Sequence, residues 1–335
     1  MCGRCACALD PQDIRRACSY NCSKAAAESQ SASSTVVEPV WITANKGQEY
    51  YPSYNVAPQS NTPVLISDQH HHVQRLLSDY EEKTERVIQV MKWGLVPQWH
   101  RGSDCKSFPT LLNNCRFDGM FDKPSFRPAI SRRQRCVVLC QGFYEWKRDK
   151  KKKEKQPYFV YFKDGALSLD KKSEATALSP PAPPPSSRLL TLAGLYDVWT
   201  PDSFSSEDTL SSLYTYTVIT VDATPSFNDI HDRLPAVLED DTAISMWLDT
   251  SIPTSQAVRC FNPRGSDSLS WHPVSSYVNN VRNKSSECVV KINEELKKKG
   301  TLHNWFKSAS SSSVSCSVTP AGDSPPLPKR SKKEC

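Results

Sequence analysis

Short apolar runs bounded by polar or turn-forming residues recur along the chain and predict β-strands. Three of these runs are rich in β-branched and aromatic residues: 135–139 (RCVVL), 158–162 (YFVYF) and 189–198 (LLTLAGLYDV). Residues 213–221 (LYTYTVITV) alternate threonine with apolar residues, which is the period-2 pattern of a strand. Asp164-Gly165, directly after the second run, is a hairpin signal.

Helices are fewer and do not alternate strictly with the strands. Residues 10–19 open with Asp10 as an N-cap and Pro11 in the first turn. Residues 239–248 predict a second helix, and residues 289–299, with an apolar stripe and a lysine-rich end, predict a third. The pattern predicts one α+β domain with a mostly antiparallel sheet and peripheral helices.

Low-complexity segments interrupt this domain and predict loop insertions. They lie at about residues 25–36, 170–187 (with the run SPPAPPPSS) and 201–212. Residues 307–335 are rich in serine and proline and then basic, which is typical of a disordered tail. We therefore expect a domain over residues 2–306 followed by a disordered basic tail.

Composition and charge narrow the classes of function. The 335 residues are 38% hydrophobic with a mean hydropathy of −0.54, and no apolar run approaches the ~18–20 residues of a membrane span. The N-terminus lacks the apolar segment of a secretory signal. The net charge of +6 is concentrated in residues 147–155 and in the tail, so the remainder of the chain is close to neutral. A uniformly basic nucleic-acid-binding surface is excluded, but local basic contacts are not.

Thirteen cysteines in a chain without an export signal favour a reducing compartment over a disulfide scaffold. Five of them fall within the first 22 residues. Their spacing resembles that of metal ligands but matches no standard zinc pattern, so a zinc-dependent nucleic-acid-binding module stays open as an alternative. The run His70-His71-His72 has no accompanying ligand frame, and we interpret it as solvated.

Cys2 is the most informative single residue. Methionine aminopeptidases generally remove Met1 before a small residue, which would leave an α-amine of pKa ~8 and a thiol of pKa ~8.5 on one residue. This pair can trap an aldehyde: the amine forms a Schiff base and the thiolate closes a five-membered thiazolidine. The alternative is an ordinary residue at a frayed terminus.

Three polar segments and one tryptophan could complete a site. Asn114-Cys115-Arg116 offers an amide and a phosphate-binding guanidinium, or is a surface turn. Glu145 lies among aromatic residues that would raise its pKa, or is half-exposed beside a core. His231-Asp232-Arg233 offers a proton carrier, or is a polar turn closed by a proline. Trp93 lies at a Gly/Pro turn, where it would stack on a base or be buried in the core.

Together these segments resemble the SRAP family, in order and at compatible spacing. The motifs are CGR at 2–4, PSYNVAP at 52–58, WGLVP at 93–97, NCR at 114–116, GFYEW at 142–146, HDRLP at 231–235 and VSSYVNN at 274–280. The resemblance covers roughly residues 2–290 with the insertions excluded. It implies a single SRAP-like domain with a barrel-like sheet, and a protein that detects abasic sites in single-stranded DNA and shields them by a covalent cross-link.

The resemblance also assigns roles to individual residues. Cys2 would be the nucleophile after loss of Met1, Asn114 would hold the opened sugar or its phosphate, Glu145 would orient and deprotonate the α-amine, and His231 would act as acid and base. The DNA-binding set would be Arg4, Asn55, Trp93, Arg116 and Arg233, with Trp93 stacking on a base. Family members are also credited with autoproteolytic release of their initiator methionine, so the expected activity is lyase-type cross-linking with a peptidase-like step.

The sequence departs from the family in a few places. Leu234 stands where methionine is usual, and the change conserves volume. Phe117 stands where a small residue is usual and would crowd a DNA groove, and Cys5 and Cys7 are additional thiols. The tail lacks a sliding-clamp motif, while its basic run at 329–333 is a nuclear-localisation candidate.

We expect a nuclear monomer that binds single-stranded DNA, with replication-fork machinery as its setting and without membrane, cofactor or metal. The rivals are the zinc module, a non-covalent reader of nucleic acid, and a cysteine peptidase that uses Cys2 and His231.

Overall fold

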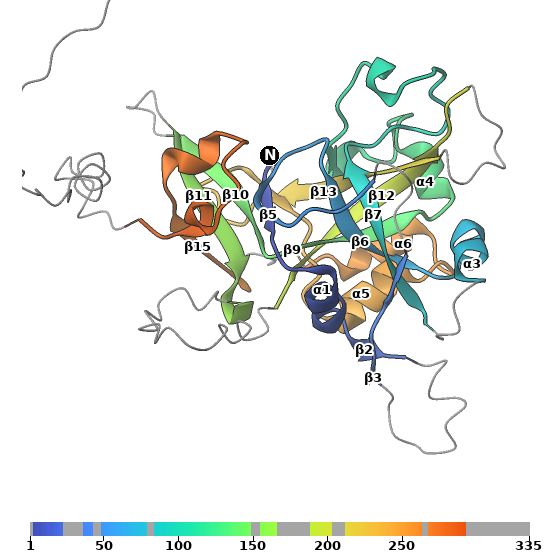
Figure 1. Ribbon diagram of the computed structural model, residues 1–335, viewed down its shortest axis with the longest axis horizontal. Helices are drawn as coiled ribbons and strands as arrows, with labels where there is room; N and C mark the ends of the chain where they lie inside the picture. The colour runs from blue at the N-terminus through green and yellow to red at the C-terminus, as the bar shows by residue number, and fades with distance from the viewer. Residues whose placement is uncertain are drawn as a thin grey trace, which may run out of the picture. The chain divides into compact units, whose positions relative to one another are not determined.

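Strands dominate the regular structure and form two large sheets and one small one, which confirms the α+β class (Figure 1). The computed structural model describes residues 3–22, 36–42, 48–78, 84–148, 155–165, 188–202, 212–262 and 267–292. All of these lie in one unit, residues 1–292. Cys2, the tail at 307–335 and most of the three predicted insertions fall outside the described residues.

The first large sheet has five strands and carries the N-terminal strand in its interior. Its order is β15-β11-β10-β1-β5, and every pairing in it is antiparallel. The strands are β1 (Cys5–Cys7), β5 (Ser53–Val56), β10 (Gly142–Arg148), β11 (Lys155–Phe162) and β15 (Leu269–Pro273). Because β1 lies between β10 and β5, the start of the chain is held against the GFYEW segment.

The second large sheet has eight strands in the order β14-β13-β12-β9-β6-β7-β4, with β8 alongside β13. A parallel pairing of β13 with β7 joins distant members of this run, so the sheet curls back on itself. Most pairs are antiparallel, as predicted, and only the pairs β13–β7, β13–β8 and β4–β7 are parallel. The strands are β4 (Val40–Ile42), β6 (Asn61–Ser67), β7 (Arg86–Trp93), β8 (Asn114–Arg116), β9 (Arg135–Cys140), β12 (Leu190–Trp199), β13 (Leu213–Asp222) and β14 (Arg233–Pro235).

Two of the predicted helices are present, and the predicted N-cap Asp10 of the first is confirmed. In α1 (Pro11–Ala17) the Asp10 carboxylate accepts the Asp13 N–H, and in α5 (Asp241–Leu248) the Asp240 carboxylate accepts the Ala243 N–H. Each cap satisfies a backbone donor that the first turn leaves without a partner. Shorter helices are α3 (His71–Leu77), α4 (Arg127–Ser131) and α6 (Thr254–Ala257), and a two-stranded sheet pairs β2 (Tyr20–Asn21) with β3 (Val36–Val37).

Two local predictions were wrong, and a third is contradicted only in its first residues. The Asp164-Gly165 signal does not join β11 to β12, because β11 pairs with β10 and β15. Of the helix expected at 289–299, Val290 is extended and Lys291 forms a bridge to Val274, while residues 293–299 fall outside the described residues. The His70–His72 run is not solvated throughout, because the imidazoles of His70 and His72 pack against Tyr196.

The core lies between and beneath the sheets and is built mainly from their inward residues. Strand β13 is central, so both of its faces are covered, and Thr215, Thr217 and Thr220 are completely buried. This explains why its threonines alternate with apolar residues without forming a wet face. None of the helices within the described ranges is both long and apolar enough to span a bilayer.

Candidate active site

One face of strand β10 looks onto the segment that follows β13. Successive residues of a strand point to opposite faces, so Phe143, Glu145 and Lys147 share one side. The Phe143 ring contacts Phe227 with centroids 6.3 Å apart, and Lys147 Nζ lies 3.7 Å from the Asp229 carboxylate. Glu145 lies between these two contacts and therefore faces the same segment.

Glu145 is a buried carboxyl with an altered proton affinity. It is only 2% exposed, and burial raises its pKa from 4.5 to about 7. The nearby Asp232 carboxylate pushes the pKa in the same direction. A carboxyl with this pKa exists in both protonation states at neutral pH, which suits it to accept and return a proton.

His231 reaches the same region from the turn between β13 and β14. Its Nδ1 lies 3.0 Å from the Arg233 N–H and 2.9 Å from an Asp232 carboxylate oxygen. A neutral imidazole accepts from the N–H, and a protonated imidazole donates to the carboxylate. The surroundings of Nδ1 thus accommodate both protonation states, as an acid–base residue requires.

Asn114 and Arg116 are positioned by the parallel pairing of β8 with β13. Asn114 lies opposite Val218 and Arg116 opposite Thr220, while Cys115 between them is completely buried. Alternation along the strand therefore turns Asn114 and Arg116 to the other face. The Arg116 side chain is half exposed and pairs with Asp118 at 2.8 Å, an exposed pair that an incoming phosphate can replace.

Arg233 sits deeper than a surface phosphate-binding residue. Its side chain is 7% exposed and contacts the carboxylates of Asp118 and Asp222 and the carbonyl of Thr220. Two carboxylates already neutralise its charge. The contacts describe an arginine that fixes β14 and the His231 turn to β13.

Comparison with known proteins identifies the family. The profile of the SOS response associated peptidase (SRAP) family matches residues 1–281. The chain belongs to the SRAP family. It is 39% identical to the abasic site processing protein HMCES of Xenopus tropicalis, over 87% of this chain and 78% of that protein. It is 37% identical to HMCES of Gallus gallus over 92% and 85%, and 30% identical to the abasic site processing protein YoqW of Bacillus subtilis over 72% and 87%.

Two crystal structures of bacterial proteins share the fold. One, from Bacteroides thetaiotaomicron, aligns with a TM-score of 0.52 at 24% identity and covers 72% of this chain and 86% of its own. Another, from Bordetella bronchiseptica, aligns with a TM-score of 0.54 at 17% identity and covers 82% and 100%. At these identities the likeness concerns the SRAP fold alone.

Two residues of the expected DNA-binding set hold a loop of this SRAP domain in place. Asn55 is completely buried, and its Nδ2 lies 2.8–3.1 Å from the carbonyls of Val278, Asn280 and Asn283. Arg4 Nη1 donates to Asn55 Oδ1 at 2.7 Å and to Val278 O at 2.8 Å. The expectation that Asn55 contacts DNA is corrected accordingly, because a side chain enclosed in this way positions the VSSYVNN segment instead.

The expectation that Trp93 stacks on a base is also corrected by its burial. Trp93 is 1% exposed, its ring stacks on Tyr216 at 6.3 Å, and its Nε1 donates to Asn113 O. Both faces of the ring are therefore covered. Trp99, two residues beyond the same turn, is 48% exposed, so its ring is the tryptophan ring of this turn that solvent reaches. Trp99 was not singled out from the sequence, although its position two residues after the WGLVP motif was a signal.

The additional thiols of Cys5 and Cys7 are enclosed by the fold. Cys5 and Cys7 are buried; a hydrogen bond with Cys140 and burial raise the pKa of Cys5, and burial raises that of Cys7. Both are thus protonated and shielded at neutral pH. Within the described ranges, no three His, Cys, Asp or Glu side chains are arranged to hold a metal ion.

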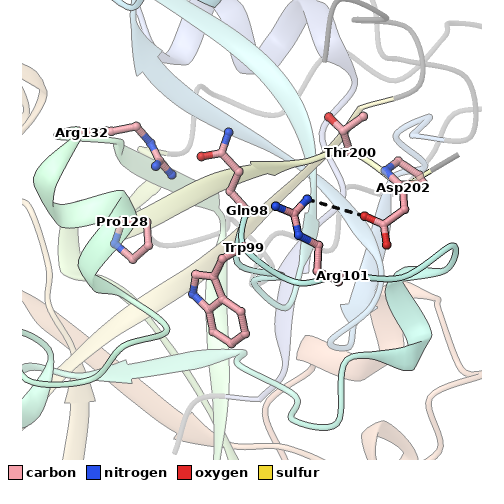
Figure 2. A pocket seen from close by; sticks show the side chains of 8 residues that line it. Gln98, Trp99, Arg101, Pro128, Arg132, Thr200 and Asp202 are labelled. Atoms are coloured by element: carbon pink, nitrogen blue, oxygen red, sulfur yellow. Dashed lines mark ion pairs between the residues drawn. The ribbon is translucent and has the colours of Figure 1, made fainter. Parts of the chain in front are cut away.

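Beside the Trp99 turn lies a polar cavity of about 450 Å³ (Figure 2). It is lined by the loop after β7, by α4 and by the residues that follow β12: Gln98, Trp99, Arg101, Pro128, Arg132, Thr200, Pro201 and Asp202. Sequence patterns could not indicate this cavity, because its walls come from three segments distant in the chain.

Proposed function

We propose that this protein recognises abasic sites in single-stranded DNA and joins itself to them covalently through Cys2, the first residue once Met1 has been removed. The observation that carries the proposal is the buried Glu145, whose pKa is about 7. Glu145 lies on β10, the strand that pairs with β1, and faces the turn that contains His231. The similarity to proteins named for abasic site processing supports DNA lesions as the substrate class.

The register of β1 supports a role for the N-terminal residue. Cys5 lies opposite Phe143, and the Tyr144 N–H donates to Arg4 O at 2.9 Å. Continuing this antiparallel register brings Gly3 opposite Glu145. One further residue adds at most ~3.6 Å of chain, so an α-amine on Cys2 is within reach of the Glu145 carboxyl.

The proposed reaction uses both groups of Cys2 and releases one water. His231 donates a proton to the ring oxygen while the anomeric hydroxyl gives its proton to water, so the abasic sugar opens to its aldehyde with no net gain or loss of protons. Glu145 accepts a proton from the α-ammonium, and the free amine attacks the aldehyde carbon to give a carbinolamine. Loss of water forms the Schiff base, and the Cys2 thiolate then adds to the imine carbon while the nitrogen takes a proton. The product is a thiazolidine.

Asn114 and Arg116 would bind the nucleotide that reacts. An amide can donate to an opened sugar hydroxyl or a phosphate oxygen, and the exposed guanidinium of Arg116 suits a backbone phosphate. Arg233 would act at one remove, by fixing the His231 turn. Met1 would be removed by hydrolysis of the Met1–Cys2 bond, with Cys2 itself as the nucleophile. We also propose that the protein acts as a monomer on nuclear DNA, with the basic run at 329–333 as its nuclear signal.

The test is a cross-linking assay with single-stranded DNA that carries one abasic site. The wild-type protein is expected to form an adduct stable on a denaturing gel, with an intact mass equal to protein without Met1 plus DNA minus one water. Cys2→Ala should give no adduct, and the matched thiol control Cys105→Ala should react like the wild type. Cross-linking by Cys2→Ala, or its absence in a wild type proven to lack Met1, would overturn the proposal.

A further inference from the structure

The polar cavity beside Trp99 contains an arginine that is held in place before any ligand arrives. Arg132 Nη2 donates to the Asp197 carboxylate at 2.7 Å, and its Nε donates to Gln134 Oε1 at 2.9 Å. The Asp197 side chain is completely buried and also accepts the N–H groups of Gln98 and Val198. These contacts fix the guanidinium plane, so little side-chain entropy is lost when it binds an anion.

The rest of this guanidinium faces the cavity. The Arg132 side chain is 40% exposed, and the described residues offer its Nη1 no acceptor. In Figure 2, Arg132 and Arg101 lie on either side of Gln98, and the indole of Trp99 lies below them. Arg101 is 85% exposed and is only loosely paired with Asp202, at 3.7 Å. The guanidinium groups of Arg132 and Arg101 therefore both line this cavity. The Arg101 group is engaged by a weak surface ion pair with Asp202.

The size and chemistry of the cavity indicate a class of ligand. About 450 Å³ falls within the range of small-ligand sites and accommodates a single nucleotide. Planar guanidinium groups match phosphate oxygens in a fork geometry, and Gln98 and Thr200 add neutral hydrogen-bonding groups on the lining. A ligand with a phosphate and a planar base suits these walls.

The cavity and the candidate active site lie along one strand. The residues at 200–202 follow Trp199, which pairs with Leu213 at the start of β13, whereas Asn114 lies opposite Val218. Five residues of strand separate these positions by roughly 17 Å. This distance corresponds to several nucleotides, so one DNA strand can reach both places.

We propose that this cavity binds a backbone phosphate and its nucleotide several positions away from the reacting abasic site, with Arg132 and Arg101 as the phosphate-binding residues. The inference rests on the proposed function for the identity of the strand. It makes the cavity a second anchor that adds affinity to longer DNA without reading its sequence.

The test measures binding of an unreactive DNA that contains a tetrahydrofuran analogue of the abasic site, over a range of salt concentrations. Each phosphate contact on single-stranded DNA contributes about 0.7 to the slope of log affinity against log salt. Arg132→Gln and Arg101→Gln should each lower that slope by about 0.7 and weaken binding several-fold. Asp202→Asn removes a competing carboxylate from the rim and should strengthen binding.

Arg127→Gln is the matched control, because Arg127 is exposed on α4 and does not line the cavity. Slopes for Arg132→Gln and Arg101→Gln that equal the Arg127→Gln slope would overturn the proposal. Arg132→Gln leaves the buried Asp197 without its partner and can lower stability, whereas Arg101→Gln does not touch Asp197 and keeps the test decisive.

Two further arms separate this inference from the proposed function. The variants should bind a trinucleotide centred on the analogue as the wild type does, since it is too short to reach the cavity; an equal loss on both lengths would contradict the second-anchor role. If dAMP bound the wild type as tightly as the long strand does, the cavity would be a free-nucleotide site, and the DNA proposal would fail. The binding assay needs no aldehyde, so failure of cross-linking leaves its result intact.

Discussion

Glu145 illustrates at the scale of one residue how burial creates chemistry. The same desolvation that raises its pKa to about 7 also destabilises the fold at higher pH, because an ionised carboxylate is held away from water. Free carboxyls titrate well below neutrality, so a proton-accepting carboxyl at pH 7 requires the burial that Glu145 has.

Replacement of Glu145 by glutamine should separate activity from stability. A glutamine cannot accept the amine proton, so cross-linking at pH 7 should slow about 100-fold. The wild-type rate should fall as the pH drops below about 7, where Glu145 becomes neutral, and the variant should lack this inflection. Single-turnover rates from pH 5.5 to 8.5 provide the measurement, and an unchanged inflection would show that another group is the base.

The same variant should be more stable than the wild type at high pH. A carboxyl whose folded pKa lies above its unfolded value of 4.5 favours folding below that value and opposes it as the pH rises through about 7. The gap corresponds to about 3 kcal/mol at full ionisation. Urea unfolding should therefore show Glu145→Gln more stable than the wild type at pH 8.5 and nearly equal at pH 4.5.

At the scale of elements, the side-chain amide of Asn55 holds strand β5 to the segment that follows β15. The Asn55 amide lies within hydrogen-bond distance of three carbonyls of the segment that follows β15 and shares its two N–H groups among them, and Arg4 adds a contact to the same segment. Sequence separations of more than 220 residues are bridged in this way. The PSYN and VSSYVNN motifs are thus two halves of one structural contact.

Asn55→Ala should unfold more easily while retaining the DNA salt slope of the wild type. It leaves buried carbonyls without donors, at a cost of about 2–4 kcal/mol in the free energy of unfolding. The control Asn61→Ala alters a more exposed asparagine whose described bond, to Glu49 O, is long at 3.3 Å. A loss of DNA affinity in fully folded Asn55→Ala would instead indicate direct contact with DNA.

Two histidines at the start of helix α3 make the stability of the fold sensitive to acid. Burial lowers the pKa of both His70 and His72 to about 4, where the rings pack on Tyr196. A histidine whose folded pKa is depressed supports the fold above its unfolded pKa of ~6.5, and this support is lost as the pH falls towards about 4. We expect His70→Gln/His72→Gln to flatten the decline in melting temperature between pH 6.5 and 4, with exposed His71→Gln as the control.

At the scale of the whole molecule, the net positive charge is concentrated in two short segments and is not spread over the domain. The positive surplus lies in residues 147–155 and in the tail, and the rest of the chain is near neutral. The described domain therefore offers DNA a few positioned guanidinium groups and not a basic face. The guanidinium groups that we propose for phosphate binding are those of Arg116, Arg101 and Arg132, whose side chains are 51%, 85% and 40% exposed.

Several features of this protein were determined by the sequence itself. Local signals were sufficient for the α+β class, for helices α1 and α5 and the cap of α1, and for the strands β9, β11, β12 and β13, because each depends on residues close together in the chain. The seven ordered motifs were sufficient for the SRAP family.

Burial and long-range pairing were decided only by the tertiary structure. Trp93 and Trp99 belong to one turn and have the same chemistry, yet one is enclosed and the other is half exposed. Asn55 carries a polar amide like Asn114, yet three distant carbonyls enclose it. Whether a side chain meets solvent depends on what the remainder of the chain packs against it, and that information lies in contacts far apart in sequence.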